Sequence, residues 1–261
     1  MIEAKNLTKK FNGFIAVDNI SFSVKEGEIF AFLGPNGAGK TTTIKIFTTL
    51  LKATSGQVLI NGYNPAKEPN KARRSFGIIF QDPSIDDELT ARENLEFHGV
   101  LYGLPKKIRR TRMAELLKIV ELWERRNDLV KNFSGGMKRR LEIARGLLHH
   151  PKIIFLDEPT LGLDPQTRNH IWNYIKKLNK MENITIFFTT HYMEEAEKVA
   201  DRIAIIDHGK IIAQGSPQEL METVGANSLE DAFLSFTGKV IRQESGSNLD
   251  RIRQRRKLWK R

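Results

Sequence analysis

Apolar and polar positions alternate in short runs along the first eighty residues, which is typical of β-strands. Five such runs predict strands at residues 2–7, 20–24, 29–33, 57–60 and 76–80. One helix is expected among them, from residue 40 to about 51, because Ile44, Phe47 and Leu51 recur at steps of three and four. The first third of the chain is therefore expected to be rich in strands.

The pattern changes at residue 82. Residues 82–150 are rich in charge and have helical periodicity, with an apolar stripe over residues 116–123. Strand-like runs then return, with helices between the first three, and a last short helix is expected at 228–238. These later runs are residues 153–157, 184–190, 202–207 and 210–215. We interpret the order as a strand-rich core interrupted by a helical insertion.

Composition narrows the class of protein. Hydrophobic residues make up 40% of the chain and charged residues 28%, but no apolar run reaches the roughly 18 residues that indicate a membrane helix. The first residues, MIEAKNLTKKF, lack the apolar core of a signal peptide. The absence of cysteine excludes disulfides and thiolate metal sites. Together these features favour the cytoplasm.

The net charge of +11 is unevenly distributed. Residues 239–261 hold nine Lys or Arg and two acidic residues, a net +7, which leaves +4 for residues 1–238. We expect this basic tail to be flexible, and either nucleic acid or an anionic membrane surface would attract it. The net charge of the whole chain therefore reflects mainly the tail and says little about the chemistry of residues 1–238.

An eight-residue segment after the third predicted strand reads GPNGAGKT, residues 34–41. It matches the phosphate loop G-x-x-x-x-G-K-[ST], with a strand before it and a helix after it. Its glycines, Gly34, Gly37 and Gly39, permit a tight turn that points N–H groups at phosphates. Lys40 then adds positive charge against the β- and γ-phosphates, and Thr41 offers a hydroxyl to Mg²⁺. The segment predicts binding of a nucleotide without specifying the reaction.

Two carboxylates follow the buried run IIFL at residues 153–156. Acidic side chains at the carboxyl end of a strand lie where α/β proteins bind ligands. Because neighbouring side chains on a strand point to opposite faces, Asp157 and Glu158 are expected to have separate roles. We expect Asp157 to hold Mg²⁺ and Glu158 to orient an attacking water. A helix-capping pair is the alternative that this segment alone leaves open.

A second phosphate-binding segment, FSGGM at residues 133–137, begins an amphipathic helix. With the two motifs above it closely resembles the nucleotide-binding subunit of ATP-binding-cassette (ABC) transporters, over residues 2–238. Three further matches follow in the order of the family: FQD with Gln81, LGLDP with Asp164, and TTH with His191. In this order and spacing, coincidence of the whole set is negligible.

The resemblance implies an α/β fold, a P-loop NTPase core of ABC type with an antiparallel β subdomain and an inserted helical signature subdomain. The implied ATPase domain is residues 1–238, with the helical subdomain at about 82–150, and residues 239–261 are the tail. The implied reaction is hydrolysis of ATP with Mg²⁺ as cofactor.

The resemblance also implies the site. Catalytic roles are expected for Lys40, Gln81, Glu158 and His191, and Mg²⁺ ligation for Thr41, Gln81 and Asp157. Phe11 is expected to stack on adenine, although Phe14 is close enough in sequence to pack there instead. The residues expected to bind ATP are Phe11, Gly34, Pro35, Asn36, Gly37, Ala38, Gly39, Lys40, Thr41, Thr42, Ser134, Gly135, Gly136 and Asp164.

In this family two ATPase subunits meet head to tail, so Ser134, Gly135 and Gly136 are expected to hold the ATP of a second copy. Hydrolysis is expected to power transport through a separate integral membrane permease at the cytoplasmic face of the membrane. The wording FSGGMKRRLEIARGLLHHP resembles the daunorubicin-resistance (ABC-2) exporters, which favours export over import. The common signature has Gln in place of Met137, so the role of that fifth residue stays open.

Two alternatives to a transport ATPase fit the sequence less well. Nucleic-acid-associated ABC ATPases typically insert a long coiled coil between phosphate loop and signature. Here only about ninety residues intervene, without sustained heptads, so no nucleic-acid partner is expected. A non-hydrolysing regulatory module is disfavoured because Lys40, Asp157, Glu158 and His191 are all present.

Overall fold

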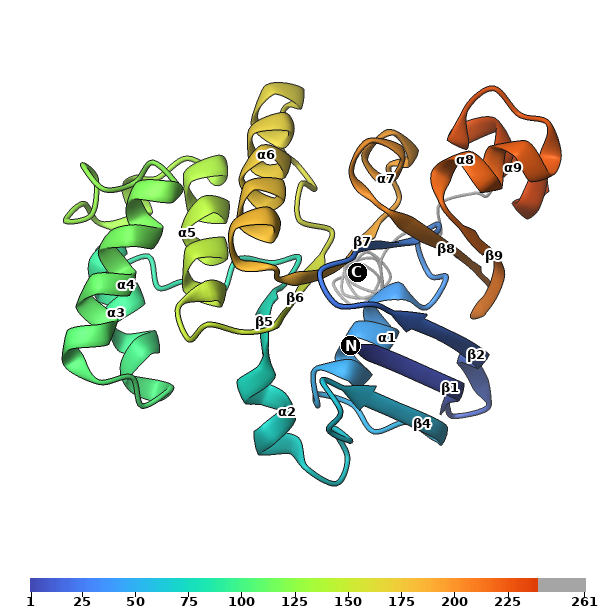
Figure 1. Ribbon diagram of the computed structural model, residues 1–261, viewed down its shortest axis with the longest axis horizontal. Helices are drawn as coiled ribbons and strands as arrows, with labels where there is room; N and C mark the ends of the chain where they lie inside the picture. The colour runs from blue at the N-terminus through green and yellow to red at the C-terminus, as the bar shows by residue number, and fades with distance from the viewer. Residues whose placement is uncertain (239–261) are drawn as a thin grey trace, which may run out of the picture.

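The computed structural model describes residues 1–238 of the chain, and the predicted tail lies outside these described residues. Figure 1 shows two sheets, with helices along the larger one and at both sides of the molecule. Within residues 1–238 the larger sheet has six strands in the order β5-β6-β7-β3-β8-β9. Their bounds are β5 Phe76–Ile79, β6 Ile153–Asp157, β7 Thr185–Thr190, β3 Ile29–Leu33, β8 Arg202–Asp207 and β9 Lys210–Gly215.

All pairs in this sheet are parallel except β8 with β9, which is antiparallel. Parallel strands are covered on both faces and therefore read as continuous apolar runs. IFAFL in β3 and IIFLD in β6 are buried at every position. Because the strands are parallel, the carboxyl ends of β3, β6 and β7 lie at one edge of the sheet, where α/β proteins bind ligands.

The smaller sheet is antiparallel, in the order β2-β1-β4, with bounds β1 Ile2–Phe11, β2 Phe14–Val24 and β4 Ser55–Ile60. β1 and β2 extend beyond the predicted runs because they form a hairpin, closed by Asn12 and Gly13 at positive φ. An Asn-Gly pair is a strong turn signal, and here it identifies the hairpin tip.

Helix α1 (Lys40–Phe47) lies between the two sheets. It ends earlier than predicted, because Thr49 adopts a positive φ. Phenylalanine rings from both sheets pack with Phe47 of α1 and with one another, at centroid distances of 5.4 to 6.0 Å. This aromatic core fixes the helix that begins directly after the phosphate loop.

The segment between β5 and β6 is helical, as the sequence predicts. It holds α3 (Ala91–Leu101), α4 (Lys106–Ile119), a 3₁₀ turn (Val130–Asn132) and α5 (Gly135–Leu147), and it forms the left side of the molecule in Figure 1. Its apolar faces join a second core on the outer face of the large sheet. A short helix before β5, α2 (Pro69–Ser75), was not predicted.

The remaining helices are α6 (Pro165–Glu182), α7 (Met193–Val199), α8 (Pro217–Val224) and α9 (Leu229–Thr237). α9 matches the helix predicted at 228–238 and begins at Ser228, whose side chain accepts a hydrogen bond from the backbone of Asp231. No helix among residues 1–238 has the length and apolarity needed to cross a membrane.

Candidate functional site

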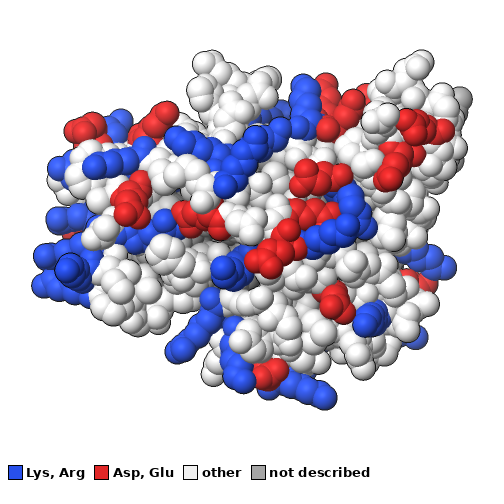
Figure 2. All heavy atoms as spheres, in the orientation of Figure 1, with Lys and Arg blue, Asp and Glu red and all other residues white. Residues whose placement is uncertain are grey.

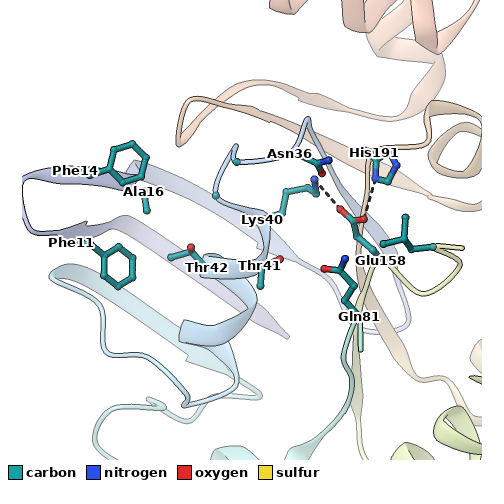
Figure 3. Close-up of a pocket in the computed structure, with 13 residues that line it drawn as sticks. Phe11, Phe14, Ala16, Asn36, Lys40, Thr41, Thr42, Gln81, Glu158 and His191 are labelled. Atoms are coloured by element: carbon teal, nitrogen blue, oxygen red, sulfur yellow. Dashed lines mark hydrogen bonds and ion pairs between the residues drawn. The ribbon is translucent and has the colours of Figure 1, made fainter. Parts of the chain in front are cut away.

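An open cleft of about 740 Å³ lies where the phosphate loop, the ends of β6 and β7, and the β1–β2 hairpin meet. Figure 3 shows its side chains converging from these separate elements. Six residues of the predicted phosphate-loop set line it: Asn36, Gly37, Gly39, Lys40, Thr41 and Thr42. Gln81, Glu158 and His191 line it as well, so the cleft contains all four residues predicted to be catalytic.

The phosphate loop connects β3 to α1, and its glycines have two different reasons to be glycine. Gly39 has φ 107°, which L side chains rarely adopt. Gly34 does not have a positive φ, but a Cβ there would lie 2.3 Å from the carbonyl oxygen of Ile206. The prediction of a tight turn therefore holds for Gly39, whereas Gly34 is needed for close approach of β8.

Lys40 extends along the loop and is only 5% exposed. Its Nζ donates to the carbonyls of Gly34, at 2.7 Å, and Pro35, at 3.2 Å, and lies 3.1 Å from Glu158 Oε1. Burial lowers the pKa of Lys40, while the charges of Glu158 and Asp157 oppose this shift. The ammonium group is thus held by oxygen atoms at the floor of the cleft.

The two predicted carboxylates point to different partners, but not through strand alternation. β6 ends at Asp157, and Glu158 turns away with φ 47°. Thr189 separates them: its hydroxyl donates to Asp157 Oδ1 at 2.6 Å and accepts from the backbone N–H of Glu158 at 3.0 Å. The strand-alternation argument is therefore wrong for this pair, because a left-handed backbone conformation sets the direction of Glu158.

Glu158 also contacts His191, whose Nδ1 lies 3.1 Å from Glu158 Oε2. Burial alone would raise the pKa of Glu158, but the hydrogen bond from His191 and the charge of Lys40 hold this pKa below its usual value. At neutral pH the carboxylate is therefore ionised, and Figure 3 shows it between Lys40 and His191. An ionised carboxylate at this position can accept a hydrogen bond from a water molecule.

His191 is supported from behind by residues that the motifs did not identify. Its ring lies 4.2 Å from that of Tyr192, and the Arg168 guanidinium lies 4.5 Å from the Tyr192 ring centroid. Arg168 also donates to the carbonyl of Leu163, at 2.8 Å. The LGLDP segment and His191 are therefore connected within one chain.

Oxygen donors suited to Mg²⁺ lie beside the phosphate loop. The Thr41 hydroxyl lies 3.3 Å from Asp157 Oδ1, and Gln81 lines the same cleft. Among residues 1–238 no group of three or more His, Cys, Asp or Glu side chains is arranged to hold a metal. A hydroxyl and one carboxylate fit Mg²⁺, which takes few protein ligands and completes its shell with phosphates and water.

The signature residues do not line the cleft. Ser134 and Gly135 are exposed, and the Ser134 hydroxyl caps α5 by accepting from the backbone N–H of Met137 at 3.3 Å. Asp164 similarly caps α6 through Thr167. The two helix starts adjoin, because a Cβ on Gly136 would lie 2.6 Å from the Thr167 methyl.

Three other predicted residues have structural positions of note. Ala38 is buried, and Pro35 takes part through its carbonyl alone. Met137 is partly buried against the apolar core of the helical segment. Its backbone N–H donates to the Ser134 hydroxyl, while its side chain packs on this core.

Both aromatic candidates for adenine stacking line the cleft at the hairpin tip. Phe11 is 40% exposed and Phe14 is 64% exposed, and the ammonium group of Lys9 lies 4.7 Å from the Phe11 ring centroid. Figure 3 shows the two rings on the same side of the cleft. The geometry is compatible with either ring beside a base.

The motifs missed a buried pair on α5, Arg139 and Glu142, which contacts the strand ends of the site. Their spacing of three residues places them on one helix face, which is the signal that the sequence offered. Their backbone targets lie some sixty residues earlier or, for Glu158, nineteen residues later, and no spacing rule connects a side chain to such partners.

A phosphate loop beside an ionised carboxylate and a histidine, with a separate signature helix, defines an ATP-hydrolysing cassette. The chain belongs to the ABC transporter family, whose profile matches residues 17–161. A linearmycin resistance ATP-binding protein of Bacillus subtilis is 45% identical over 88% of this chain and 73% of its own length. A daunorubicin/doxorubicin resistance ATP-binding protein of Streptomyces peucetius is 43% identical over 87% and 69%, respectively.

A solved dimeric ATP-binding cassette in a post-hydrolysis state, bound to ADP and phosphate, has the same fold. Its TM-score is 0.74 at 33% identity, and the match covers 83% of this chain and 98% of the solved one. The predicted fold and the resemblance to the daunorubicin-resistance subgroup are thereby confirmed. The chain is an ATP-binding subunit with ATPase activity.

Proposed function

We propose that this chain powers export as one of two identical ATPase subunits attached to a separate membrane permease at its cytoplasmic face. The observation that carries the proposal is the contact series Lys40–Glu158–His191, with both distances at 3.1 Å, on the floor of the cleft. This series joins a phosphate-binding cation to an ionised base. Such a pair suits in-line attack of water on a terminal phosphate.

Each cleft residue has a distinct role in this reaction. The N-terminus of α1 and the loop N–H groups bind phosphate oxygens, and Lys40 neutralises their charge. Mg²⁺ held by Thr41, Asp157 and Gln81 would supply further positive charge to the β- and γ-phosphates. Glu158 orients water by accepting its hydrogen bond, and His191 holds Glu158 in place while donating towards the γ-phosphate.

The dimer completes the site. Ser134, Gly135 and Gly136 lie outside the cleft of their own chain, with Ser134 and Gly135 exposed at the start of α5. A helix start with free N–H groups is suited to a phosphate that comes from elsewhere. A head-to-tail second copy would bring its ATP there, as the dimeric relative suggests. Asp164 lies beside this surface and would face the same partner.

Export is favoured by the relatives, which are named for resistance to linearmycin and daunorubicin. We infer that the permease is a separate chain and that it docks on the helical segment. Three apolar side chains near the end of α3 are exposed by 55% to 67%: Phe97, Val100 and Leu101. A contiguous exposed apolar surface of this kind marks a protein interface.

Glu158→Gln tests the proposed base. The variant keeps the shape of the side chain but removes the charge that accepts the proton, so we expect ATP binding within about twofold of wild type. We expect phosphate release to fall about 100-fold or more. ATP-held dimers should then accumulate during size-exclusion chromatography with ATP.

A matched control is Glu28→Gln. Glu28 is 7% exposed and pairs with Arg202 at 3.0 Å, but it precedes β3 and lies far from the loop that follows β3. It should retain hydrolysis even if its melting temperature falls. Full ATPase activity in Glu158→Gln would refute the assignment of the base.

A further inference from the structure

Helix α5 carries a buried ion pair behind its exposed start. Arg139 and Glu142 are 6% and 1% exposed, and Arg139 Nη1 lies 3.0 Å from Glu142 Oε2. Burial lowers the pKa of Arg139, and the charges of Glu142 and Asp157 oppose this shift. Buried ion pairs contribute little net stability, because desolvation offsets their attraction. The contacts of the pair therefore indicate its role better than its burial does.

Arg139 reaches backbone carbonyls that belong to the nucleotide site. Its guanidinium donates to the carbonyl of Phe80 at 2.6 Å, to that of Gln81 at 3.2 Å, and to that of Glu158 at 3.4 Å. A guanidinium can serve all of these acceptors because its five N–H groups form a rigid planar fork. One side chain of the signature helix thus holds the backbone of the proposed Mg²⁺ ligand and of the proposed base.

Glu142 holds Ser84, at the other end of the segment that begins with Gln81. Its Oε1 accepts from the backbone N–H of Ser84 at 2.7 Å and from the Ser84 hydroxyl at 3.3 Å. Arg145, one turn further along α5, donates to the carbonyl and the hydroxyl of Ser84. The exposed segment from Gln81 to Ser84 is therefore fastened to α5 at both ends.

The hydrogen bond from Arg139 to the carbonyl of Glu158 matters most for the position of the proposed base. Glu158 adopts φ 47°, a left-handed conformation that non-glycine residues hold only when their surroundings require it. Its N–H is bonded to Thr189 and its carbonyl faces Arg139, so both backbone groups are held from outside β6. Removing Arg139 would leave the direction of the carboxylate less well defined.

We propose that Arg139 and Glu142 are positioning residues for hydrolysis, which fix Gln81 and Glu158 relative to the signature helix. The inference rests on the proposed function, since Glu158 is taken there as the base. Ser134 lies at the start of the same helix. The pair therefore links the surface proposed to bind the partner's ATP to the base that acts on the ATP in the chain's own cleft. Within each chain, α5 therefore connects the two ATP sites of a dimer.

Arg139→Gln is the main test, performed on the full chain with ATP and Mg²⁺. We expect kcat to fall at least tenfold while KM and the affinity for a fluorescent ATP analogue change less than about twofold, because the phosphate loop is untouched. Arg139→Lys should recover part of kcat, since it retains the charge but cannot reach all the carbonyls. A purely structural role would not produce this split between kcat and KM.

Arg112→Gln is the matched control. Arg112 is also 6% exposed, pairs with Glu182 at 2.6 Å and donates to the carbonyl of Leu147, but it contacts no residue of the cleft. We expect it to lower the melting temperature as much as Arg139→Gln does and to leave kcat unchanged. A kcat loss of equal size in both variants would overturn the proposal.

Glu142→Gln gives an independent measurement if Arg139→Gln folds poorly. The amide oxygen still accepts from Ser84, but Arg139 loses its counter-charge, so kcat should again fall with KM retained. Wild-type kcat in Arg139→Lys and Glu142→Gln would also overturn the proposal. Glu158→Gln, assayed in parallel, distinguishes failure of the proposed base from failure of the proposed positioning role. If Glu158→Gln loses activity while the Arg139 and Glu142 variants retain theirs, only the positioning role is wrong.

Discussion

Lys40 and Glu158 form an ion pair in which both side chains are at least 92% buried. In so little water their attraction is strong, but so is the cost of desolvating them. The phosphates of ATP would compete with Glu158 for the same ammonium group. On the proposed function, binding of the nucleotide would shift Lys40 towards phosphate and free the carboxylate of Glu158 to orient water.

The Ser134 hydroxyl has two roles in this description, as helix cap and as part of the cradle for a second ATP. Ser134→Ala should lower stability by about 1 kcal/mol, through loss of the cap. It should also reduce phosphate release about tenfold or more, while leaving ATP binding by the monomer within about twofold. Thermal unfolding, phosphate release and binding of a fluorescent ATP analogue would measure these three quantities.

Ser228→Ala provides the comparison for Ser134→Ala. Ser228 caps α9 by accepting from the backbone N–H of Asp231 at 3.1 Å, and it lies outside both phosphate sites. It should show the same loss of stability with full hydrolysis. Equal losses of binding and hydrolysis in Ser134→Ala would argue against a role across the subunit interface.

At this scale the sequence predicted the side chains that belong to compact motifs. Lys40, Thr41 and Asp157 were identified because a strand–loop–helix context makes their chemistry recognisable. Arg139 and Thr189 were not, because each acts on backbone or carboxylate groups more than thirty residues away. Such contacts depend on how elements pack, which residue patterns do not encode.

At the scale of elements, a cluster of three aromatic rings connects the helical segment to the core. His98 and Tyr102, from α3 and its end, lie against His149, which follows α5 and whose Nε2 bonds the carbonyl of Phe76 at 3.0 Å. Burial lowers the pKa of His98 and of His149 to about 4. Among residues 1–238, nothing hydrogen-bonds to His98 Nε2.

This cluster predicts a specific loss of stability in acid. The folded-state pKa of about 4 lies below the value near 6.5 of an unfolded histidine, so the unfolded chain binds more protons between these pH values. The stabilisation is complete above about pH 6.5 and is lost as the pH falls towards 4. At pH 5 each histidine should account for on the order of 1–2 kcal/mol.

His98→Phe should therefore flatten the decline in melting temperature between pH 7 and pH 5, by a few degrees. His170→Phe, at an exposed position on α6, is the control and should leave the slope as in wild type. An unchanged slope in His98→Phe would show that folding does not lower the pKa of His98.

Element types were largely predictable here, whereas element ends were less so. The strand and helix periods identified the helical segment and the later strands, because apolar spacing differs between the two structures. The extension of β1 and β2 was missed, because the residues beside the turn, 9–11 and 14–15, are partly or fully exposed and the buried neighbours Ala16 and Val17 do not alternate. Hydrogen-bonded pairing of the two strands across the turn at Asn12 and Gly13, rather than burial of apolar side chains, makes these residues strands.

For the molecule as a whole, the proposed docking surface for the permease can be tested by substitution. Figure 2 shows Lys and Arg side chains bordering uncharged surface on the left, where α3 and α4 lie in Figure 1. Phe97→Ser and Leu101→Ser should retain the ATPase rate of the isolated chain, because both residues lie outside the cleft. Both should reduce co-purification with the membrane partner at least fivefold.

Met181→Ser controls for the general effect of removing an exposed apolar side chain. Met181 is 59% exposed near the end of α6, a helix outside the segment that carries Phe97 and Leu101. It should co-purify with the partner as wild type does. If all three variants co-purify equally well, the permease docks on a different surface.

The order of strands in the large sheet was beyond the sequence patterns. β3 pairs with β7 and β8, whose paired residues follow it by 157 positions (Ile29 with Ile186) and 172 positions (Phe30 with Arg202), and local periodicity cannot indicate such partners. The general architecture followed from the family resemblance instead, since the order of motifs implies the order of the elements that carry them.

This strand order also has a consequence for synthesis on the ribosome. Residues 29–33, an entirely apolar strand, leave the ribosome long before either sheet neighbour has been made. At 5–20 residues per second the delay is on the order of 10–30 s, during which an unpaired apolar strand is open to association with other chains. The newborn chain would therefore need chaperones or temporary local packing during this delay, and β3, which leads into the phosphate loop, can take its place in the sheet only after residues 185–207 have been made.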